Sequence, residues 1–293
     1  MSAQARLEYV SCNLCGSSDT RLLYKAFSTR YNQPEQFNLV KCNGCGLVYT
    51  NPRIKPEFIA RYYPGHYKYH EQRMISFCER LYYMYHRNPK TKKGKVLDVG
   101  CGNGSYLYFL KNRGWDCYGT EINEALINFI KSKLNLKKIF KCQLYEIDLP
   151  GNYFDLITFW GSLEHIDDPF KTLTKAHELL KPCGKIIIWI PNIESLEAKL
   201  FKKFWHHLEI PTHYYQFSPE TICHLLRKIG YKIYRIRFDA VSLGLFPSLG
   251  YSLNKFGLKI NMNLLPIKIL SIPIDMLSSF FKISGLMTIY ATK

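Results

Sequence analysis

Residues 96–110 read VLDVGCGNGSYLYFL. The apolar residues at the start of this stretch predict a short buried strand, and the segment from Tyr106 onward is typical of a helix. Gly100, Gly102 and Gly104 fall between the two. Because glycine has no Cβ, it tolerates a positive φ and lets another molecule approach the backbone. The stretch therefore predicts a strand–turn–helix unit whose turn holds a nucleotide-type ligand.

The residues around this turn narrow the choice of ligand. A P-loop needs Gly-Lys-Ser or Gly-Lys-Thr, which this turn lacks. The dinucleotide motif G-x-G-x-x-G is also incomplete, because Ser105 stands where its third glycine belongs. Asp98, two residues before the first glycine, disfavours a pyrophosphate and attracts a cation. S-adenosylmethionine carries a sulfonium and an α-ammonium group, and it is the cofactor that these residues favour.

A second acid supports this choice. Glu121 ends the next predicted strand, in CYGTEIN, 17 residues after Gly104. A carboxylate at a strand end can accept hydrogen bonds from both hydroxyls of a ribose, as in other α/β nucleotide-binding folds. The alternative is an ordinary surface acid at the end of a strand. The register of Glu121 with the glycine turn favours ribose binding.

From Lys95 onward, strand and helix patterns alternate, which predicts an α/β fold with a parallel sheet covered on both faces. The predicted strands are 96–100, 117–121, 138–143, 154–160, 184–190, 231–238 and 286–292. The predicted helices are 104–113, 123–134, 169–180, 194–204 and 218–229.

Local signals mark the ends of two of these helices. Asp168 can cap the N-terminus of one helix, and Pro169 suits its first position. The sequence KPCGK predicts that the same helix stops at Gly184. Ser218, in FSPE, is the expected N-cap of the last helix.

Residues 9–52 contain two cysteine pairs, and this segment is called the cysteine module below. Cys12 and Cys15 are followed, after 26 intervening residues, by Cys42 and Cys45. Each pair has a two-residue spacer and is followed by glycine, which is typical of a metal-binding knuckle. Four thiolates complete a tetrahedral shell and leave no position for water, so the predicted Zn²⁺ is structural.

The formal net charge of +17 is unevenly distributed. Residues 1–93 carry a net +9, residues 94–190 a net +1 and residues 191–293 a net +7. Basic flanks around a neutral middle suit an anionic substrate, a membrane surface or nucleic acid. A generally lysine-rich proteome would produce the same imbalance.

The chain divides into five segments. Residues 9–52 are the cysteine module, 53–93 a tyrosine-rich helical connector and 94–239 the Rossmann-like core that binds the cofactor. Residues 240–285 are an apolar insertion, and 286–293 form the final strand. The insertion is too interrupted by proline and charge for a transmembrane helix. It could cover the active site, lie on a membrane or pack on the sheet.

The cysteines and the N-terminal sequence bear on localisation. MSAQARLEYVSCNLCG has no apolar stretch typical of a secretory signal. Ten cysteines in a chain that is not exported suggest reduced thiols. We expect a cytoplasmic protein, with peripheral contact at the inner face of the membrane as a further option.

The motifs VLDVGCGNG, GTEIN and FDLITFWGSLEHIDDPFKTLTKAHELLKPCGKIIIWIPN resemble the class I S-adenosylmethionine-dependent methyltransferases. The resemblance is to their small-molecule branch, which includes ubiquinone-type O-methyltransferases, and it covers 95–238. The paired cysteines followed by YYPGHY resemble the zinc-binding module that precedes methyltransferase domains in bacterial sugar pathways. The resemblance implies a Rossmann-like seven-stranded sheet with its last strand antiparallel, preceded by a zinc-ribbon-like module.

The resemblance also implies a set of cofactor contacts. Gly100 and Gly102 would lie against the methionyl part, and Asp98 would hold its amino group. Residues 142–144 would flank the adenine, although the acid often found there is missing. The full set expected to contact the cofactor is Asp98, Gly100, Cys101, Gly102, Gly104, Glu121, Ile122, Leu144 and Trp160.

The loop WGSLEHIDDP, after the fourth predicted core strand, is where the methyl acceptor should bind. His165 is the first candidate for a base, and Glu164 would orient it or contact the cofactor. His213 could enter the pocket from WHHLEIPTHYYQFSPE, with His206 and His207 as weaker candidates. The alternative for the Glu-His pair is purely structural, as part of the loop before a helix cap.

Three functions remain open from the sequence. The first is methyl transfer to a small molecule, either a sugar or glycan intermediate or a quinone-type hydroxyl, which would be anionic or lipid-linked. The second is an RNA methyltransferase, although no RGG or RRM-like motif is present, and DNA is not expected as a partner. The third is a non-catalytic scaffold that binds the cofactor. The oligomeric state stays open.

Overall fold

The structure of the chain is a computed structural model. It describes residues 6–28, 33–63, 74–89, 91–239, 244–255, 257–258 and 265–293. Parts of the predicted connector at 53–93 and of the apolar segment at 240–285 therefore lie outside the described residues.

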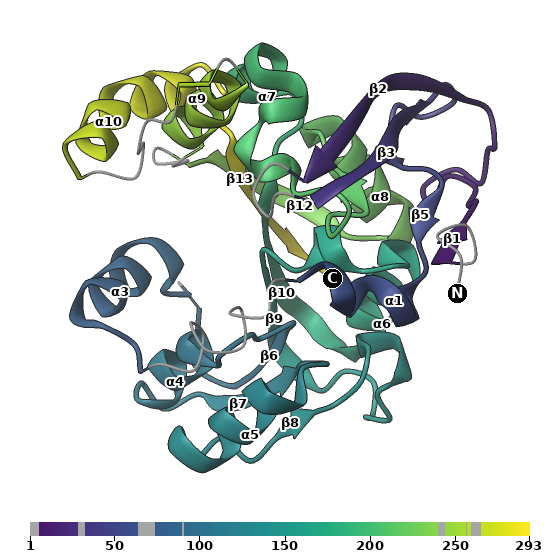
Figure 1. Cartoon of the computed structure of the whole chain (residues 1–293). Helices are drawn as coiled ribbons and strands as arrows, with labels where there is room; N and C mark the ends of the chain where they lie inside the picture. The colour runs from purple at the N-terminus through teal and green to yellow at the C-terminus, as the bar shows by residue number, and fades with distance from the viewer. Residues whose placement is uncertain are drawn as a thin grey trace.

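A seven-stranded sheet forms the centre of the molecule, with the strand order β12-β13-β10-β9-β6-β7-β8 (Figure 1). Its strands are β6 (Lys95–Val99), β7 (Asp116–Thr120), β8 (Ile139–Phe140), β9 (Phe154–Trp160), β10 (Leu180–Pro191), β12 (Lys232–Phe238) and β13 (Leu286–Thr292). Strand β13 is antiparallel to both of its neighbours, whereas the other pairs are parallel. The predicted seven-stranded sheet with an antiparallel last strand is confirmed.

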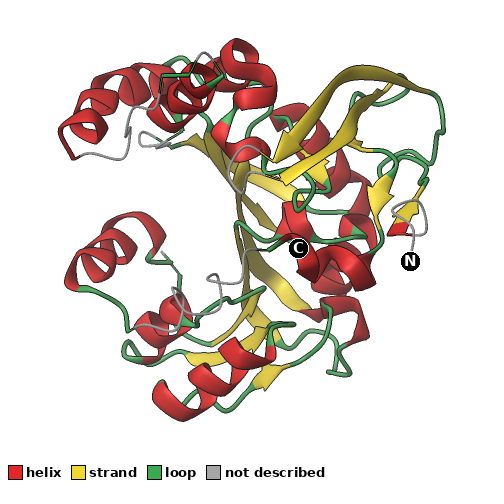
Figure 2. Cartoon of the chain, in the orientation of Figure 1, coloured by secondary structure: helices red, strands yellow, loops and turns green. Residues whose placement is uncertain are grey.

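Helices cover both faces of this sheet (Figure 2). They include α4 (Ser105–Lys111), α5 (Glu124–Lys133), α6 (Pro169–Leu179) and α8 (Pro219–Ile229). Successive strand residues point to opposite faces. In β6, Val96 packs into one buried apolar cluster with residues of α4 and α5, while Leu97 and Val99 pack into another with residues of α6 and α8. The near-continuous apolar strands of the sequence are thus explained by burial on two sides.

The predicted helix starts are confirmed by the caps. The Asp168 side chain accepts a hydrogen bond from the Lys171 N–H at 2.9 Å, and Pro169 takes the first turn of α6. Ser218 caps α8 by accepting from the Thr221 N–H at 3.1 Å.

The predicted end of α6 at Gly184 is wrong. The helix ends at Leu179, and β10 begins at the next residue. Pro182 disfavours helical geometry in the residue before it and has no N–H to donate, so the chain leaves the helix early. The left-handed conformation falls on Cys183, with φ of 62°, and not on the glycine. Strand β8 is also shorter than the predicted 138–143.

The cysteine module folds around a second, four-stranded sheet with the order β11-β4-β3-β2. Its strands are β2 (Thr20–Ser28), β3 (Gln33–Cys42), β4 (Val48–Thr50) and β11 (Tyr215–Gln216), and a separate pair is formed by β1 (Leu7–Glu8) and β5 (Arg53–Ile54). Strand β11 comes from the loop between β10 and α8, so the core contributes a strand to the sheet of the module. The module is therefore joined to the core by backbone hydrogen bonds.

The remaining helices are α1 (Pro56–Ile59), α3 (Phe77–Tyr82), α7 (Leu196–Phe201), α9 (Leu245–Asn254) and α10 (Leu265–Phe280). Short helical turns occupy Ala60–Tyr62, Tyr83–Arg87, Leu144–Glu146, Leu163–His165, Lys202–Phe204 and His206–Leu208. Among the helices that the structure describes, none has the length and apolar content to cross a membrane.

Candidate active site

A cavity of about 510 Å³ opens at the carboxyl ends of β6, β9 and β10. Ligands of open α/β sheets bind at this edge. The cavity is lined by Tyr63, Glu79, Tyr83, Arg87, Asp98, Gly100, Cys101, Gly102, Asn103, Ser105, Tyr106, Trp160, Gly161, Glu164, His165, Trp189, Pro191, His206, His207, Glu209, His213 and Leu286. Of the predicted site residues, Asp98, Gly100, Cys101, Gly102, Trp160, Glu164, His165 and His213 are among them.

The glycine turn after β6 has the geometry that the sequence predicted. Gly100, Gly102 and Gly104 have φ values of 68°, 54° and 71°, which L side chains rarely adopt. A Cβ on Gly100 would lie 2.7 Å from the Cβ of Ser162, whereas a Cβ on Gly102 would meet no atom within 4 Å. The backbone at Gly102 therefore faces open space in the cavity, where a ligand can approach it.

Asp98 lies at the bottom of this turn and is 3% exposed. Its Oδ1 accepts a hydrogen bond from the Thr158 hydroxyl at 2.7 Å. Burial raises the pKa of Asp98 to about 7, although the Thr158 hydrogen bond and the charge of Arg87 both oppose the shift. A buried carboxylate of this kind is stabilised by a cationic ligand. The donor chemistry of the turn thus fits S-adenosylmethionine.

Glu121 holds the turn and is not a cavity-lining residue among those that the structure describes. Its carboxylate accepts hydrogen bonds from the N–H groups of Gly102 at 3.0 Å, Ile122 at 2.8 Å and Asn123 at 2.8 Å. It therefore fixes the backbone of the turn against the start of α5. Because a carboxylate oxygen has two lone pairs, it can accept a ribose hydroxyl in addition to a backbone N–H. Ribose binding by Glu121 stays a prediction.

Three other predicted cofactor contacts also lie outside the cavity lining of the described chain. A Cβ on Gly104 would be 2.9 Å from Ile130, so this glycine allows α5 to pack against the turn. Ile122 is 55% exposed beside the turn, and Leu144 is fully buried in the core. The structure thus brings five of the nine predicted cofactor contacts together in the cavity, Trp160 included, and places the other four behind or beside it.

Arg87 enters the cavity from the segment before β6. Its guanidinium lies over the rings of Trp160 and Trp189, 4.3 and 4.8 Å from their centroids. The indole N–H of Trp189 in turn donates to the Asp239 carboxylate. A cation held by aromatic faces beside the glycine turn can pair with an anionic group of a ligand.

Glu164, His165 and His213 converge in the same cavity. One ligand atom of each lies within 4.8 Å of the others. The two imidazole rings meet edge to face, with centroids 4.4 Å apart. The loop after β10 brings His213 here because the N–H of Tyr214 donates to the Glu164 carbonyl at 2.9 Å.

The environments of Glu164 and His165 differ. Glu164 is 3% exposed, and its Oε2 has no hydrogen-bond partner within the described chain. Burial raises the pKa of Glu164 to about 8, and the charge of Glu209 adds to the shift. The Nδ1 atom of His165 lies 3.0 Å from the Tyr63 hydroxyl and 3.0 Å from the Thr212 carbonyl oxygen. These contacts hold the imidazole ring at a fixed orientation.

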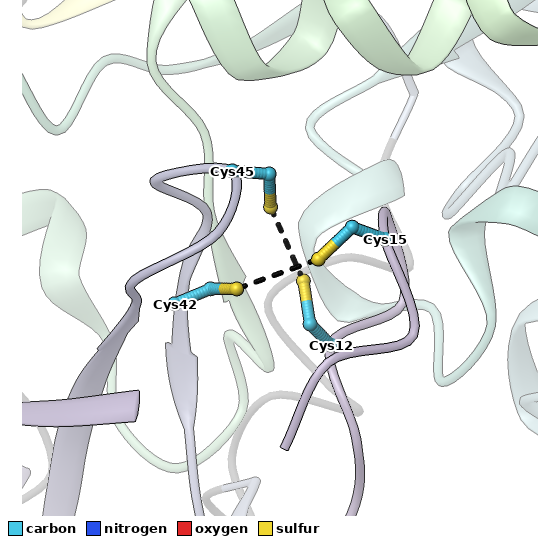
Figure 3. Close-up of side chains that lie close together, drawn as sticks. All are labelled: Cys12, Cys15, Cys42 and Cys45. Atoms are coloured by element: carbon cyan, nitrogen blue, oxygen red, sulfur yellow. Dashed lines mark hydrogen bonds between the residues drawn. The ribbon is translucent and has the colours of Figure 1, made fainter. Parts of the chain in front are cut away.

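The four cysteines of the module form a second cluster, away from the cavity lining (Figure 3). The Sγ atoms of Cys12 and Cys45 are 3.4 Å apart, and those of Cys15 and Cys42 are 3.5 Å apart. These separations are far longer than a disulfide bond and close to the edge of a tetrathiolate zinc site. The predicted convergence of the four thiols is confirmed, and the cluster fits Zn²⁺.

The first cysteine knuckle contacts the loop that carries Glu164 and His165. The Asn13 amide donates to Asp168 at 2.9 Å and accepts from the Phe170 N–H at 2.8 Å. Arg53, just after the module, donates to the Asp167 carbonyl at 2.7 Å. The module thus supports the end of the loop that forms one wall of the cavity.

Three cavity residues were not singled out in the sequence, namely Arg87, Trp189 and Glu209, whereas Tyr63 comes from the tyrosine-rich connector. Arg87 lies outside every quoted motif, whereas Trp189 and Glu209 fall inside quoted stretches in which no local pattern marks them for the cavity. His206 and His207, the weaker candidates, do line the cavity.

Known proteins are similar to parts of this chain. A ubiquinone biosynthesis O-methyltransferase from Coxiella burnetii (strain Dugway 5J108-111) is 34% identical over 116 residues, which are 38% of this chain and 49% of that protein. One from Acinetobacter baylyi is 26% identical over 152 residues, 47% of this chain and 63% of that protein. The chain spans about half the length of the Coxiella burnetii relatives that it matches.

Solved structures share the fold. An S-adenosylmethionine-dependent methyltransferase from Archaeoglobus fulgidus has a TM-score of 0.52 at 24% identity, over 73% of this chain and 92% of that one. Another, from Mesorhizobium loti, has a TM-score of 0.51 at 14% identity, over 72% and 95% of the two chains. The family model described as a methyltransferase domain matches residues 68–236, more than half of the chain. The chain therefore belongs to the methyltransferase domain family.

Proposed function

We propose that this protein transfers a methyl group from S-adenosylmethionine to a hydroxyl group of a small molecule. One observation carries the proposal: a single cavity contains both the Asp98 glycine turn and the cluster of Glu164, His165 and His213. The turn fits a cationic nucleoside, and the cluster offers groups that can take up a proton. Donor and acceptor would therefore meet in one cavity.

The chain's own residues would mainly bind and align the reactants. S-adenosylmethionine supplies a methyl group that is already activated on a sulfonium sulfur. The turn and Asp98 would fix its methionyl end, while the aromatic walls around Trp160 exclude water. Alignment of two reactants in this way is worth about 7–11 kcal/mol of barrier. An acceptor hydroxyl must also lose its proton, and His165 is the candidate to accept it.

The geometry of His165 suits that role. If its Nδ1 carries the proton and donates to the Thr212 carbonyl, its Nε2 is the basic nitrogen. During transfer, the acceptor oxygen forms the new bond to the methyl carbon, the sulfur–carbon bond breaks, and its electron pair stays on sulfur. The hydroxyl proton passes to the base.

A quinone-type phenolic hydroxyl is the acceptor class with most support. The curated relatives are named for ubiquinone biosynthesis O-methylation, and they are about one third identical at best over the matched region. A sugar or glycan hydroxyl is the other class, and the basic flanks of the chain would suit an anionic form of it.

We further propose that the cysteine module holds one structural Zn²⁺ through Cys12, Cys15, Cys42 and Cys45. The distances between their sulfur atoms support this assignment, and four thiolate ligands leave no open position for chemistry.

The test is a transfer assay with radiolabelled S-adenosylmethionine and three acceptor classes: demethylated quinone-type phenols, nucleotide sugars and total RNA. We expect label in the phenol or sugar fraction, and a loss of about 100-fold or more in His165→Gln. The matched control is His224→Gln, an exposed histidine on α8, which should retain full activity. Label only in RNA, or binding of the cofactor without any transfer, would overturn the proposal.

A further inference from the structure

The cluster of Glu164, His165 and His213 has more donor groups than the acceptance of one proton requires. It combines two imidazoles and one carboxylate whose ligand atoms lie within 4.8 Å of one another. Glu164 comes from the turn after β9, and His213 comes from the loop between β10 and α8. Two segments almost fifty residues apart in sequence thus bring nitrogen and oxygen donors close together at the cavity.

The Glu164 side chain gives an independent indication of a ligand. It is 3% exposed, and its Oε2 atom has no hydrogen-bond partner in the part of the chain that the structure describes. Leaving a buried carboxyl oxygen without a partner destabilises the fold, because the oxygen has lost its water and gained no hydrogen bond. Because the same residue lines the cavity, a bound cation is a partner that would satisfy it.

The surroundings of His165 are those of a metal ligand. Metal-binding histidines usually have their second ring nitrogen held by a carbonyl, carboxylate or hydroxyl group, which fixes the tautomer. Here Nδ1 is 3.0 Å from the Thr212 carbonyl oxygen and 3.0 Å from the Tyr63 hydroxyl. The other ring nitrogen, Nε2, is then the one through which His165 would bind a cation.

We propose that Glu164, His165 and His213 bind a divalent first-row transition metal ion in the acceptor half of the cavity. Two imidazoles and one carboxylate are the donor set of catalytic Zn²⁺ sites and of non-haem Fe²⁺ sites, which keep open coordination positions. Glu209 lies next to this set, with its Oε2 atom 3.9 Å from Nε2 of His213. This site differs from the tetrathiolate cluster, whose four ligands would close the shell.

The role of such an ion rests on the proposed function. A metal ion with open positions would bind the acceptor hydroxyl and lower its pKa. The hydroxyl proton would pass to the Glu209 carboxylate, the oxygen would form the bond to the methyl carbon, and the sulfur–carbon electron pair would stay on sulfur. His165 would then act as a ligand and not as the base. Acceptors with two adjacent oxygens, such as catechol-type phenols, would fill two positions.

The direct test uses Co²⁺ on the whole chain loaded with a single equivalent of Zn²⁺, which the four thiolates bind first, so that the second site stays open to Co²⁺. Co²⁺ bound by imidazole and carboxylate absorbs weakly in the visible range, whereas thiolate-bound Co²⁺ adds intense charge-transfer absorption, so one spectrum distinguishes the two clusters. We expect one equivalent of Co²⁺ to bind without thiolate absorption. Glu164→Gln and His213→Gln should each weaken this binding by about 100-fold, and Tyr63→Phe by about 10-fold.

Matched controls are Glu220→Gln and His224→Gln, which change the same residue types at exposed positions of α8. Both should bind Co²⁺ as the unchanged protein does. Binding of S-adenosylmethionine is measured on every sample, because it reports on the fold and on the proposed function independently of the metal. If a site variant fails to fold, the titration of the unchanged protein still decides.

Two results would overturn the inference. The first is an unchanged protein that binds S-adenosylmethionine and shows no Co²⁺ absorption other than that of thiolate ligation. The second is Co²⁺ binding that Glu164→Gln and His213→Gln leave intact. In either case a methyl transfer that persists would leave the proposed function standing with His165 as the base.

Discussion

At the scale of single residues, the ionised form of Asp98 lowers the stability of the fold but favours the binding of a cationic cofactor. Burial raises its pKa from 3.8 to about 7, so the folded chain holds this proton more tightly than the unfolded chain. The free energy of unfolding must therefore fall as the pH rises between these two values. Asp98→Asn removes the titrating group and keeps an oxygen for the Thr158 hydroxyl. We expect the variant to be more stable than the unchanged protein by about 2–4 kcal/mol at pH 8.

Urea denaturation at pH 4 and pH 8 measures this difference. The stability gain should shrink towards zero at pH 4, because this pH is close to the unfolded-state pKa of 3.8 and the folded-state carboxyl group is then fully protonated. A variant that is less stable at pH 8 would show that Asp98 holds the fold together and is not kept for a ligand. Loss of S-adenosylmethionine binding in the same variant would show what the buried charge is for.

The same residue gives the cofactor affinity a pH dependence. A cationic ligand binds the ionised form of Asp98, and that form is the minor one at pH 6 because the pKa is about 7. We expect calorimetric titration to show an affinity for S-adenosylmethionine about tenfold higher at pH 8 than at pH 6. Glu164→Gln is the control, because it removes the other buried acid of the cavity and should keep the dependence. Equal affinities at the two pH values would mean that Asp98 does not face the bound cation.

At the scale of elements, the first cysteine knuckle stabilises the start of α6. Asn13 bonds both the Asp168 cap and the Phe170 N–H, and it is the residue after the first cysteine of its pair. Asn43 occupies the same position in the second knuckle, and within the described residues its side-chain amide bonds only the exposed Asp19 side chain. We expect Asn13→Ala to lower the free energy of unfolding by about 1–2 kcal/mol and Asn43→Ala to change it by less than about 0.5 kcal/mol.

Thermal unfolding compares the stabilities of the two variants, and the metal content of each sample is determined first. Since the two asparagines have the same place in their knuckles, any shared effect on metal binding cancels. Equal losses of stability in the two variants would contradict a specific support of α6 by the module.

The elements of the core were predictable because their signals are local. The glycine turn, the Asp168 and Ser218 caps and the apolar strands each depend on neighbours within a few residues, and the structure confirms them. The end of α6 was missed because Pro182 outweighed the glycine two residues later. Arg87 and Trp189 could not be assigned to the cavity, because only the topology of the sheet brings them together.

At the scale of the whole molecule, two helices carry exposed apolar side chains. In Figure 1, α3 and α10 both lie at the left of the view, with α10 above α3. At the end of α10, Leu277, Phe280 and Phe281 are 60%, 78% and 64% exposed, and Phe77 at the start of α3 is 74% exposed. Exposed patches of this kind on a basic protein are typical of contact with an anionic membrane surface.

The net charge of +17 and the exposed Lys282 next to Phe281 predict that these side chains contact anionic lipid. We expect the protein to sediment with vesicles that contain anionic lipid and not with neutral ones, because charge attracts the protein before the aromatic rings insert. Changing Phe280 and Phe281 together to Ser should weaken this binding by about tenfold or more, since each buried ring contributes about 1.5–3 kcal/mol at most. The control is Tyr9→Ser, which changes an 83% exposed aromatic residue beside β1 and should leave vesicle binding unchanged. Equal binding to neutral vesicles, or a double variant that binds as well as the unchanged protein, would exclude α10 as the membrane contact.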